Sequence, residues 1–69
     1  MEFSRPTRLV SLDDIVATLE FPTRTTGLPV GKPGRRHWSR TERGRDTHVV
    51  FEVWDDGTVY VVTVFRRPG

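Results

Sequence analysis

The stretch DTHVVFEVWDDGTVYVVTVF, residues 46–65, decides the fold. Its two halves are rich in Val, Thr and aromatic residues, a composition that favours β-strands. Between the halves stands DDG, residues 55–57, which suits a three-residue hairpin loop made of a type I turn closed by a glycine bulge. The stretch therefore predicts two antiparallel strands joined by a tight hairpin.

The residues before this stretch extend the same pattern toward the N-terminus. RHWSRT, residues 36–41, predicts a third strand, and ERG, residues 42–44, predicts a second loop of the same three-residue kind. Further back, PTRTTGLPVGKPGR, residues 22–35, holds three prolines and three glycines. This segment predicts a loop, with a short edge strand near residues 24–28.

One helix is predicted, over SLDDIVATLEF, residues 11–21. Ser11 can cap its start, with Asp14 three residues later, and Pro22 ends it because the residue before a proline avoids helical geometry. Apolar residues at helical spacing form one stripe: Leu12, Ile15, Val16 and Leu19. We therefore expect one domain over residues 1–69 with an α+β fold, in which the helix packs on a three- to four-stranded antiparallel β-meander at 36–67, after an extended lead-in at 1–10.

Length and composition exclude several classes of protein. A chain of 69 residues can bury only a modest core, so oligomerisation would help its stability. The chain has no cysteine, which excludes disulfides and thiolate metal sites, and two histidines alone argue against a structural zinc site, so we expect neither a metal nor a cofactor. No apolar run reaches the roughly 18 residues of a membrane span, and the N-terminus lacks a signal-peptide core. We expect a cytoplasmic protein with no membrane partner.

Basic residues are concentrated in the middle of the chain. The formal net charge of the whole chain is +2, yet residues 24–48 hold seven basic residues and only two acidic ones. Such asymmetry indicates an acidic partner, often a nucleic acid. Ten of the eleven basic residues are arginine, which suits bidentate phosphate binding, although a GC-rich genome would produce the same bias.

The two predicted loops set a register, and the register sorts side chains between the faces of the sheet. We expect Trp54 opposite Thr58, and Thr41 opposite Arg45. The face beneath the helix then collects Val49, Phe51, Val53, Val59, Val61 and Phe65. The opposite face collects Arg36, Trp38, Arg40, His48, Glu52, Tyr60 and Arg66, together with Val50, Val62 and Val64. This second face is a candidate RNA surface, because bases can stack on Trp38 or Tyr60 while arginines bind phosphates.

Two segments, SLDDIVATLE at residues 11–20 and RGRDTHVVFEVWDDGTVYVVTVFRR at residues 43–67, carry a family resemblance. A short helix that leads through a loop into a meander closed by VYVVTVFR resembles the RelE/BrnT-like superfamily of small ribonuclease toxins. Colicin-type tRNase domains share the broad pattern. The resemblance covers about residues 9–67. It implies metal-independent RNA cleavage, in which the 2′-OH attacks the neighbouring phosphate, arginines stabilise the phosphorane and His, Glu or Tyr transfer protons.

The resemblance also implies which residues form the site. The basic residues on the sheet would be Arg36, Arg40 and Arg66. The acid or base would be His37 or His48, assisted by Glu52 and Tyr60, and Thr63 matches a hydroxyl on the last strand. The nucleic-acid-binding set is Arg35, Arg36, Trp38, Arg40, Arg43 and Arg45. Family members usually have a longer helical start with a basic residue or histidine, whereas this chain begins MEFSRPTRL. Either Arg5 or Arg8 would substitute, or the site is incomplete.

The predicted function is therefore an endoribonuclease toxin that acts on RNA such as tRNA or mRNA, controlled by a cognate antitoxin or immunity protein. An alternative is a non-catalytic phage- or plasmid-type module that binds a host protein or nucleic acid, with Val50, Val62 and Val64 as an interface that could form a homodimer. A third is an RNA-binding scaffold without chemistry.

Each candidate residue also has a structural explanation. His48 can be a half-buried strand residue, His37 an exposed bystander, and Trp38 a packing residue. Glu52 and Tyr60 can be an ordinary cross-strand pair. The arginine cluster can be a charged edge that prevents aggregation.

Overall fold

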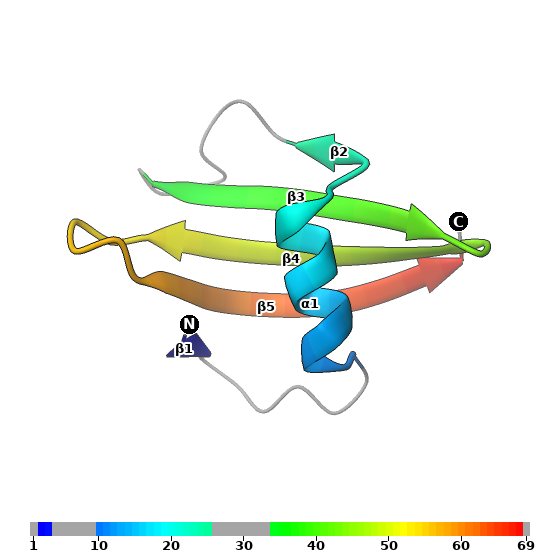
Figure 1. Cartoon of the computed structure of the whole chain (residues 1–69), viewed down its shortest axis with the longest axis horizontal. Coiled ribbons are helices and arrows are strands. Elements are labelled where there is room, and N and C mark those ends of the chain that lie inside the picture. Colours follow the sequence, from blue (N-terminus) through cyan, green and yellow to red (C-terminus); the bar gives the residue numbers. More distant parts are fainter. Residues whose placement is uncertain (1, 4–9, 26–33, 69) are drawn as a thin grey trace.

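The structure, a computed structural model, describes residues 2–3, 10–25 and 34–68. Among these residues a single helix lies across one face of a five-stranded sheet (Figure 1). The strand order is β1-β5-β4-β3-β2. The elements are β1 (Glu2–Phe3), α1 (Leu12–Glu20), β2 (Arg24–Thr25), β3 (Arg35–Glu42), β4 (Arg45–Val53) and β5 (Val59–Pro68). Strands β2 to β5 pair antiparallel, and β1 adds a short parallel pairing with β5 that was not predicted. The predicted α+β fold, one helix on an antiparallel meander, is confirmed.

Helix α1 begins and ends where the sequence indicated. The Ser11 hydroxyl accepts a hydrogen bond from the Asp14 N–H at 3.2 Å, and the Phe21 N–H closes the last turn on the Ala17 carbonyl at 2.8 Å. The predicted stripe is wrong at one position, because Leu12 is 57% exposed. Thr18 is buried instead, and its hydroxyl donates to the Asp14 carbonyl at 2.7 Å, so a polar side chain enters the helix–sheet interface without an unpaired hydroxyl.

The core lies between α1 and the middle of the sheet. Its buried members are Val10, Ile15, Val49, Phe51 and Val61, with Leu19, Trp38, Val59 and Val64, which are partly buried, packed against them. Each such side chain stabilises the fold by about 1.5–3 kcal/mol through burial of apolar surface. The Trp38 ring meets Phe51 edge-on, with centroids 5.0 Å apart. Trp38 is therefore a packing residue beneath the helix.

The turn between β3 and β4 differs from the prediction and changes the faces of β3. Glu42 pairs with Arg45, which leaves a two-residue turn, and both of its residues have positive φ, 52° at Arg43 and 74° at Gly44. Such type I′ turns match the twist of the flanking strands. The register moves by one residue relative to the three-residue loop. The predicted face is therefore wrong for Arg36, Trp38 and Arg40, which lie on the helix side of the sheet opposite Phe51, Val49 and Thr47.

The hairpin between β4 and β5 follows the prediction at its turn and departs from it further on. The Trp54 N–H donates to the Thr58 carbonyl at 2.9 Å, and Glu52 pairs with Tyr60 as expected. A β-bulge then interrupts the register, with Val62 as the additional residue, so that His48 pairs with Phe65.

The bulge corrects three further predictions. Phe65 leaves the core side of the sheet, whereas Val64 and Arg66 lie on the helix side, opposite Val49 and Thr47. Val64 packs against the core, so it does not belong to the predicted valine interface on the uncovered face.

The N-terminal Arg5 and Arg8, and most of the glycine- and proline-rich loop, lie outside the described residues.

Candidate nucleic-acid interface

The open face is the side of the sheet opposite α1, which no helix covers among the described residues (Figure 1). Successive side chains of β3, β4 and β5 point to opposite faces of the sheet, so the observed register determines which residues lie on the open face. They are Arg35, His37, Ser39, Thr41, Asp46, His48, Val50, Glu52, Tyr60, Thr63, Phe65 and Arg67. Trp54, directly after β4, joins them through its contact with Tyr60.

Three rings and one guanidinium form a group in the middle of the open face. His37 Nε2 lies 2.9 Å from His48 Nδ1, a hydrogen bond that links β3 to β4. The His48 ring is stacked on Phe65 of β5, with centroids 4.7 Å apart and an interplanar angle of 4°. The Arg67 guanidinium lies 5.1 Å from the Phe65 centroid. We call His37, His48 and Phe65 the imidazole group.

A second ring pair lies near the β4–β5 turn. Trp54 is stacked on Tyr60, with centroids 5.2 Å apart and an interplanar angle of 14°. The indole N–H points to Glu52 Oε2 at 3.4 Å, and the other carboxylate oxygen of Glu52 binds Arg35 at 3.0 Å. These contacts fix the indole plane, and Trp54 remains 43% exposed. We call Trp54 and Tyr60 the indole pair.

The environment of His48 favours its neutral form. Burial is the largest cause that lowers the pKa of His48, and the neighbouring His37 and Arg67 lower it further, against the opposing effect of Asp46. His48 Nε2 is buried and has no hydrogen-bond partner in the described structure. In its neutral form His48 can either donate to His37 or accept from it through this contact, depending on which ring nitrogen carries the proton.

A shallow cavity of about 300 Å³ adjoins the imidazole group. His37, Ser39 and His48 line one side of it, and Arg24 of the edge strand β2 lines another. Asp46, a further lining residue, accepts a hydrogen bond from the Thr41 hydroxyl. The cavity thus offers hydroxyl, carboxylate and guanidinium groups beside an aromatic surface.

The structure separates the predicted site residues into two groups. On the open face it brings together Arg35, His37, His48, Glu52, Tyr60 and Thr63. On the helix side lie Arg36, Trp38, Arg40, Arg45 and Arg66, with Arg43 in the turn beside them. The predicted concentration of arginines beside the histidines therefore does not form. The one-residue change in the β3–β4 turn moves Arg36 and Arg40 to the helix side, and the bulge in β5 does the same for Arg66.

Three residues that supply a ring or a cation to the open face, Phe65, Arg67 and Trp54, were missed at the sequence level. Phe65 was assigned to the core because nothing in the run VYVVTVF marks the bulge. Arg67 follows Phe65 in the alternation and was missed for the same reason. Trp54 could have been assigned to the open face from the sequence. It lies two residues after Glu52, so the register set by the predicted DDG turn places both side chains on the same face of the sheet.

Comparisons with protein-family models, with curated proteins and with solved structures find no match to this chain. The resemblance to the RelE/BrnT-like superfamily stays a prediction. Within the described residues, no three His, Asp or Glu side chains lie together as metal ligands would. Over the same residues, the helix is neither long enough nor apolar enough to cross a membrane.

Proposed function

We propose that this protein binds single-stranded RNA through the open face, acting in the cytoplasm. One observation supports this function most strongly: five rings lie on the sheet face that α1 does not cover. They form two separate groups, the imidazole group and the indole pair, and the rings within each group contact one another. Aromatic rings on an exposed sheet stack with unpaired bases, and stacking tolerates sequence because every base has a π-face.

Guanidinium groups lie beside both ring groups, where the phosphates of a stacked strand would run. Arg67 covers Phe65, and Arg35 is anchored by Glu52 next to the indole pair. Arg24 lines the cavity beside the imidazole group. Arginine binds phosphate in a bidentate manner and also stacks on bases, so these side chains can contribute affinity without specifying sequence.

The proposal is tested by fluorescence anisotropy with a short labelled oligouridine and a labelled RNA duplex. Trp54→Leu should weaken binding of the single strand by about 1–3 kcal/mol, roughly 5- to 150-fold, because one stacking ring is lost. Phe21→Leu is the matched control: Phe21 is 65% exposed, at the C-terminal end of α1 on the other side of the sheet, and its loss should leave affinity unchanged. Equal effects of the two variants, or preference for the duplex, would refute the proposal.

A second candidate function, metal-independent RNA cleavage on the same face, is favoured by the histidine contact. One imidazole would accept the proton of a 2′-OH as this oxygen attacks the adjacent phosphorus. The other imidazole, protonated, would donate to the departing 5′-oxygen, which leaves a 2′,3′-cyclic phosphate and a 5′-hydroxyl. Glu52, Tyr60 and Thr63 lie on the same face. In this form of the hypothesis Arg35 and Arg67 replace Arg40 and Arg66 as the cations nearest the reaction.

Cleavage is tested with end-labelled RNA in the presence of a chelator. The wild type should release products with cyclic phosphate ends, and His48→Gln should release none even at protein concentrations at which the variant is saturated with RNA. For a toxin, induced expression should also stop growth, His48→Gln should restore growth, and a cognate antitoxin should cover the open face. If the RNA stays intact after incubation with the wild type, the catalytic proposal is refuted, whereas the proposal of RNA binding is unaffected.

A further inference from the structure

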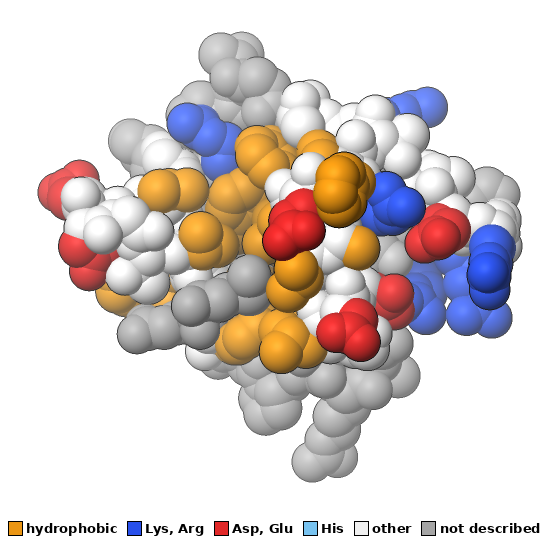
Figure 2. All heavy atoms as spheres, in the orientation of Figure 1, with side chains coloured by type: hydrophobic (Ala, Val, Ile, Leu, Met, Phe, Trp, Pro, Cys, Tyr) orange, Lys and Arg blue, Asp and Glu red, His pale blue; other side chains and the backbone are white. Residues whose placement is uncertain are grey.

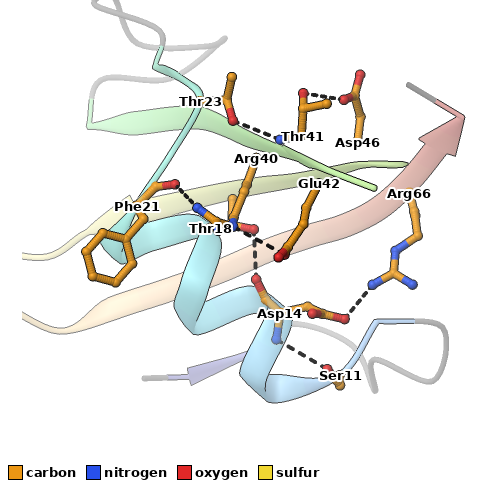
Figure 3. A network of polar contacts seen from close by, with 10 residues as sticks. All are labelled: Ser11, Asp14, Thr18, Phe21, Thr23, Arg40, Thr41, Glu42, Asp46 and Arg66. Atoms are coloured by element: carbon orange, nitrogen blue, oxygen red, sulfur yellow. Dashed lines mark hydrogen bonds and ion pairs between the residues drawn. The ribbon is translucent and has the colours of Figure 1, made fainter. Parts of the chain in front are cut away.

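A cavity of about 470 Å³ lies on the helix side, away from the open face, between α1 and the ends of β3, β4 and β5. Its lining consists of Asp14, Ala17, Thr18, Arg40, Glu42, Arg43, Arg45, Thr47 and Arg66, which we call the arginine pocket. Figure 3 shows Arg40 directed toward the Phe21 carbonyl at the end of α1 and Arg66 directed toward Asp14 in its first turn. Figure 2 shows basic side chains gathered at this end of the molecule, near the β3–β4 turn.

The acidic residues of the arginine pocket do not balance its basic ones. Arg66 is held by Asp14, and Arg40 donates to the Phe21 carbonyl at 2.7 Å and lies 3.6 Å from Glu42. Arg43 and Arg45 form no ion pair with any described residue. Four guanidinium groups thus face two carboxylates, and the pocket keeps a net positive charge.

Two of the guanidinium groups also have donors that lack acceptors. The Nε atoms of Arg40 and Arg66 are buried and make no hydrogen bond within the described structure, although Arg40 Nε lies 3.6 Å from Glu42 Oε2. A buried charged donor without an acceptor is destabilising, so such atoms call for an explanation. Asp14 stays ionised, because its hydrogen bond with Ser11, followed by that with Arg66, lowers the pKa of its carboxyl. The acid orients Arg66 but leaves its Nε unused.

We propose that the arginine pocket binds a phosphate group. A phosphate monoester presents three acceptor oxygens and up to two negative charges, which matches a pocket whose four guanidinium groups outnumber its two carboxylates and in which Arg43 and Arg45 form no ion pair with a described residue. The cavity volume lies within the range of small-molecule sites. The phosphate can belong to a small phosphate monoester or to a nucleic-acid strand. The site is independent of the open face, because the two lie on opposite sides of the sheet.

The test follows the arginine Nε resonances by NMR during titration with inorganic phosphate, uridine 5′-monophosphate, uridine and acetate. Arg40 and Arg66 should shift with the two phosphates and remain unchanged with uridine and acetate. Arg45→Gln should weaken phosphate binding roughly tenfold, since it removes one charge-assisted donor. Arg36→Gln is the matched control, because Arg36 lies on the same side of the sheet but outside the pocket lining, and it should leave binding unchanged.

A further titration with oligouridine lacking terminal phosphates distinguishes the two sources. Shifts with uridine 5′-monophosphate and none with this RNA assign the pocket to small phosphate monoesters, whereas shifts with the RNA assign it to internal phosphates. Absence of shifts with every phosphate compound, or equal weakening by Arg45→Gln and Arg36→Gln, would overturn the proposal. Trp54→Leu should not alter the phosphate titration, so failure of RNA stacking and failure of the pocket are separable results.

Discussion

The turn that orients β3 contains a backbone strain that one substitution should release. Arg43 has a φ of 52°, a left-handed conformation that costs a residue with a Cβ roughly 1–2 kcal/mol. Asparagine adopts this region more readily, and Asn-Gly is the preferred pair in a type I′ turn. Arg43 is exposed and forms no ion pair with the described residues, so its replacement removes no packing. Arg43→Asn should therefore stabilise the fold by about 1 kcal/mol, a rise in Tm of about 4–8 °C for a chain of this size.

The assay is thermal and urea denaturation followed by circular dichroism. Arg45→Asn is the control, since it removes the same charge at a strand position with ordinary backbone angles. This variant should be neutral or slightly less stable, because asparagine is unfavourable in strands. A three-residue loop over residues 42–44 would place only Gly44 in the left-handed region, and asparagine at position 43 would then bring no gain. Unchanged or reduced stability of Arg43→Asn would refute the turn, and with it the assignment of Arg40 to the helix side.

Three further predictions concern the open face and the helix contact. Phe65→Leu should weaken RNA binding in anisotropy titrations by about 1–3 kcal/mol, while Trp38→Phe, beneath the helix, should not change affinity. Between the folded and unfolded pKa values of His48 the unfolded chain binds more protons than the folded one. The contribution of His48 to stability is therefore fully present above about pH 6.5 and declines as the pH falls through its lowered folded value; denaturation midpoints of His48→Gln should show a weaker decline. Asp14→Asn, which removes the partner of Arg66, should lower the free energy of unfolding by about 0.2–1 kcal/mol in urea titrations, and a larger loss would mean that the ion pair is more than a half-exposed surface contact.

Local signals predicted the elements of this fold well. The Ser11 cap and Pro22 indicated the ends of α1, and the DDG turn indicated the pairing of Glu52 with Tyr60. Each of these signals comes from a residue that is compatible with few local backbone conformations. The composition of β3, β4 and β5 gave the strands. These signals suffice for the α+β class.

The face on which each site residue lies could not be predicted in the same way. ERG is compatible with a three-residue loop and with a two-residue turn, and the latter requires Arg43 to take a conformation that arginine rarely adopts. The run VYVVTVF lacks alternation, so the apolar pattern cannot show which residue is additional. A register change of one residue, at the β3–β4 turn or at the bulge in β5, determines on which face these side chains lie: Arg36, Trp38, Arg40, Phe65 and Arg66.

The bulge in β5 allows a single strand to supply interior packing and a binding surface from what looks like uniform sequence. Val61 and Val64 both point inward although three positions separate them, and Phe65 points outward. A distant relative with a regular final strand would preserve both surfaces only if it were one residue shorter at Val62. Alignments in this region should therefore open a single-residue gap inside the strand, since an ungapped alignment would equate interior positions of one protein with exterior positions of the other.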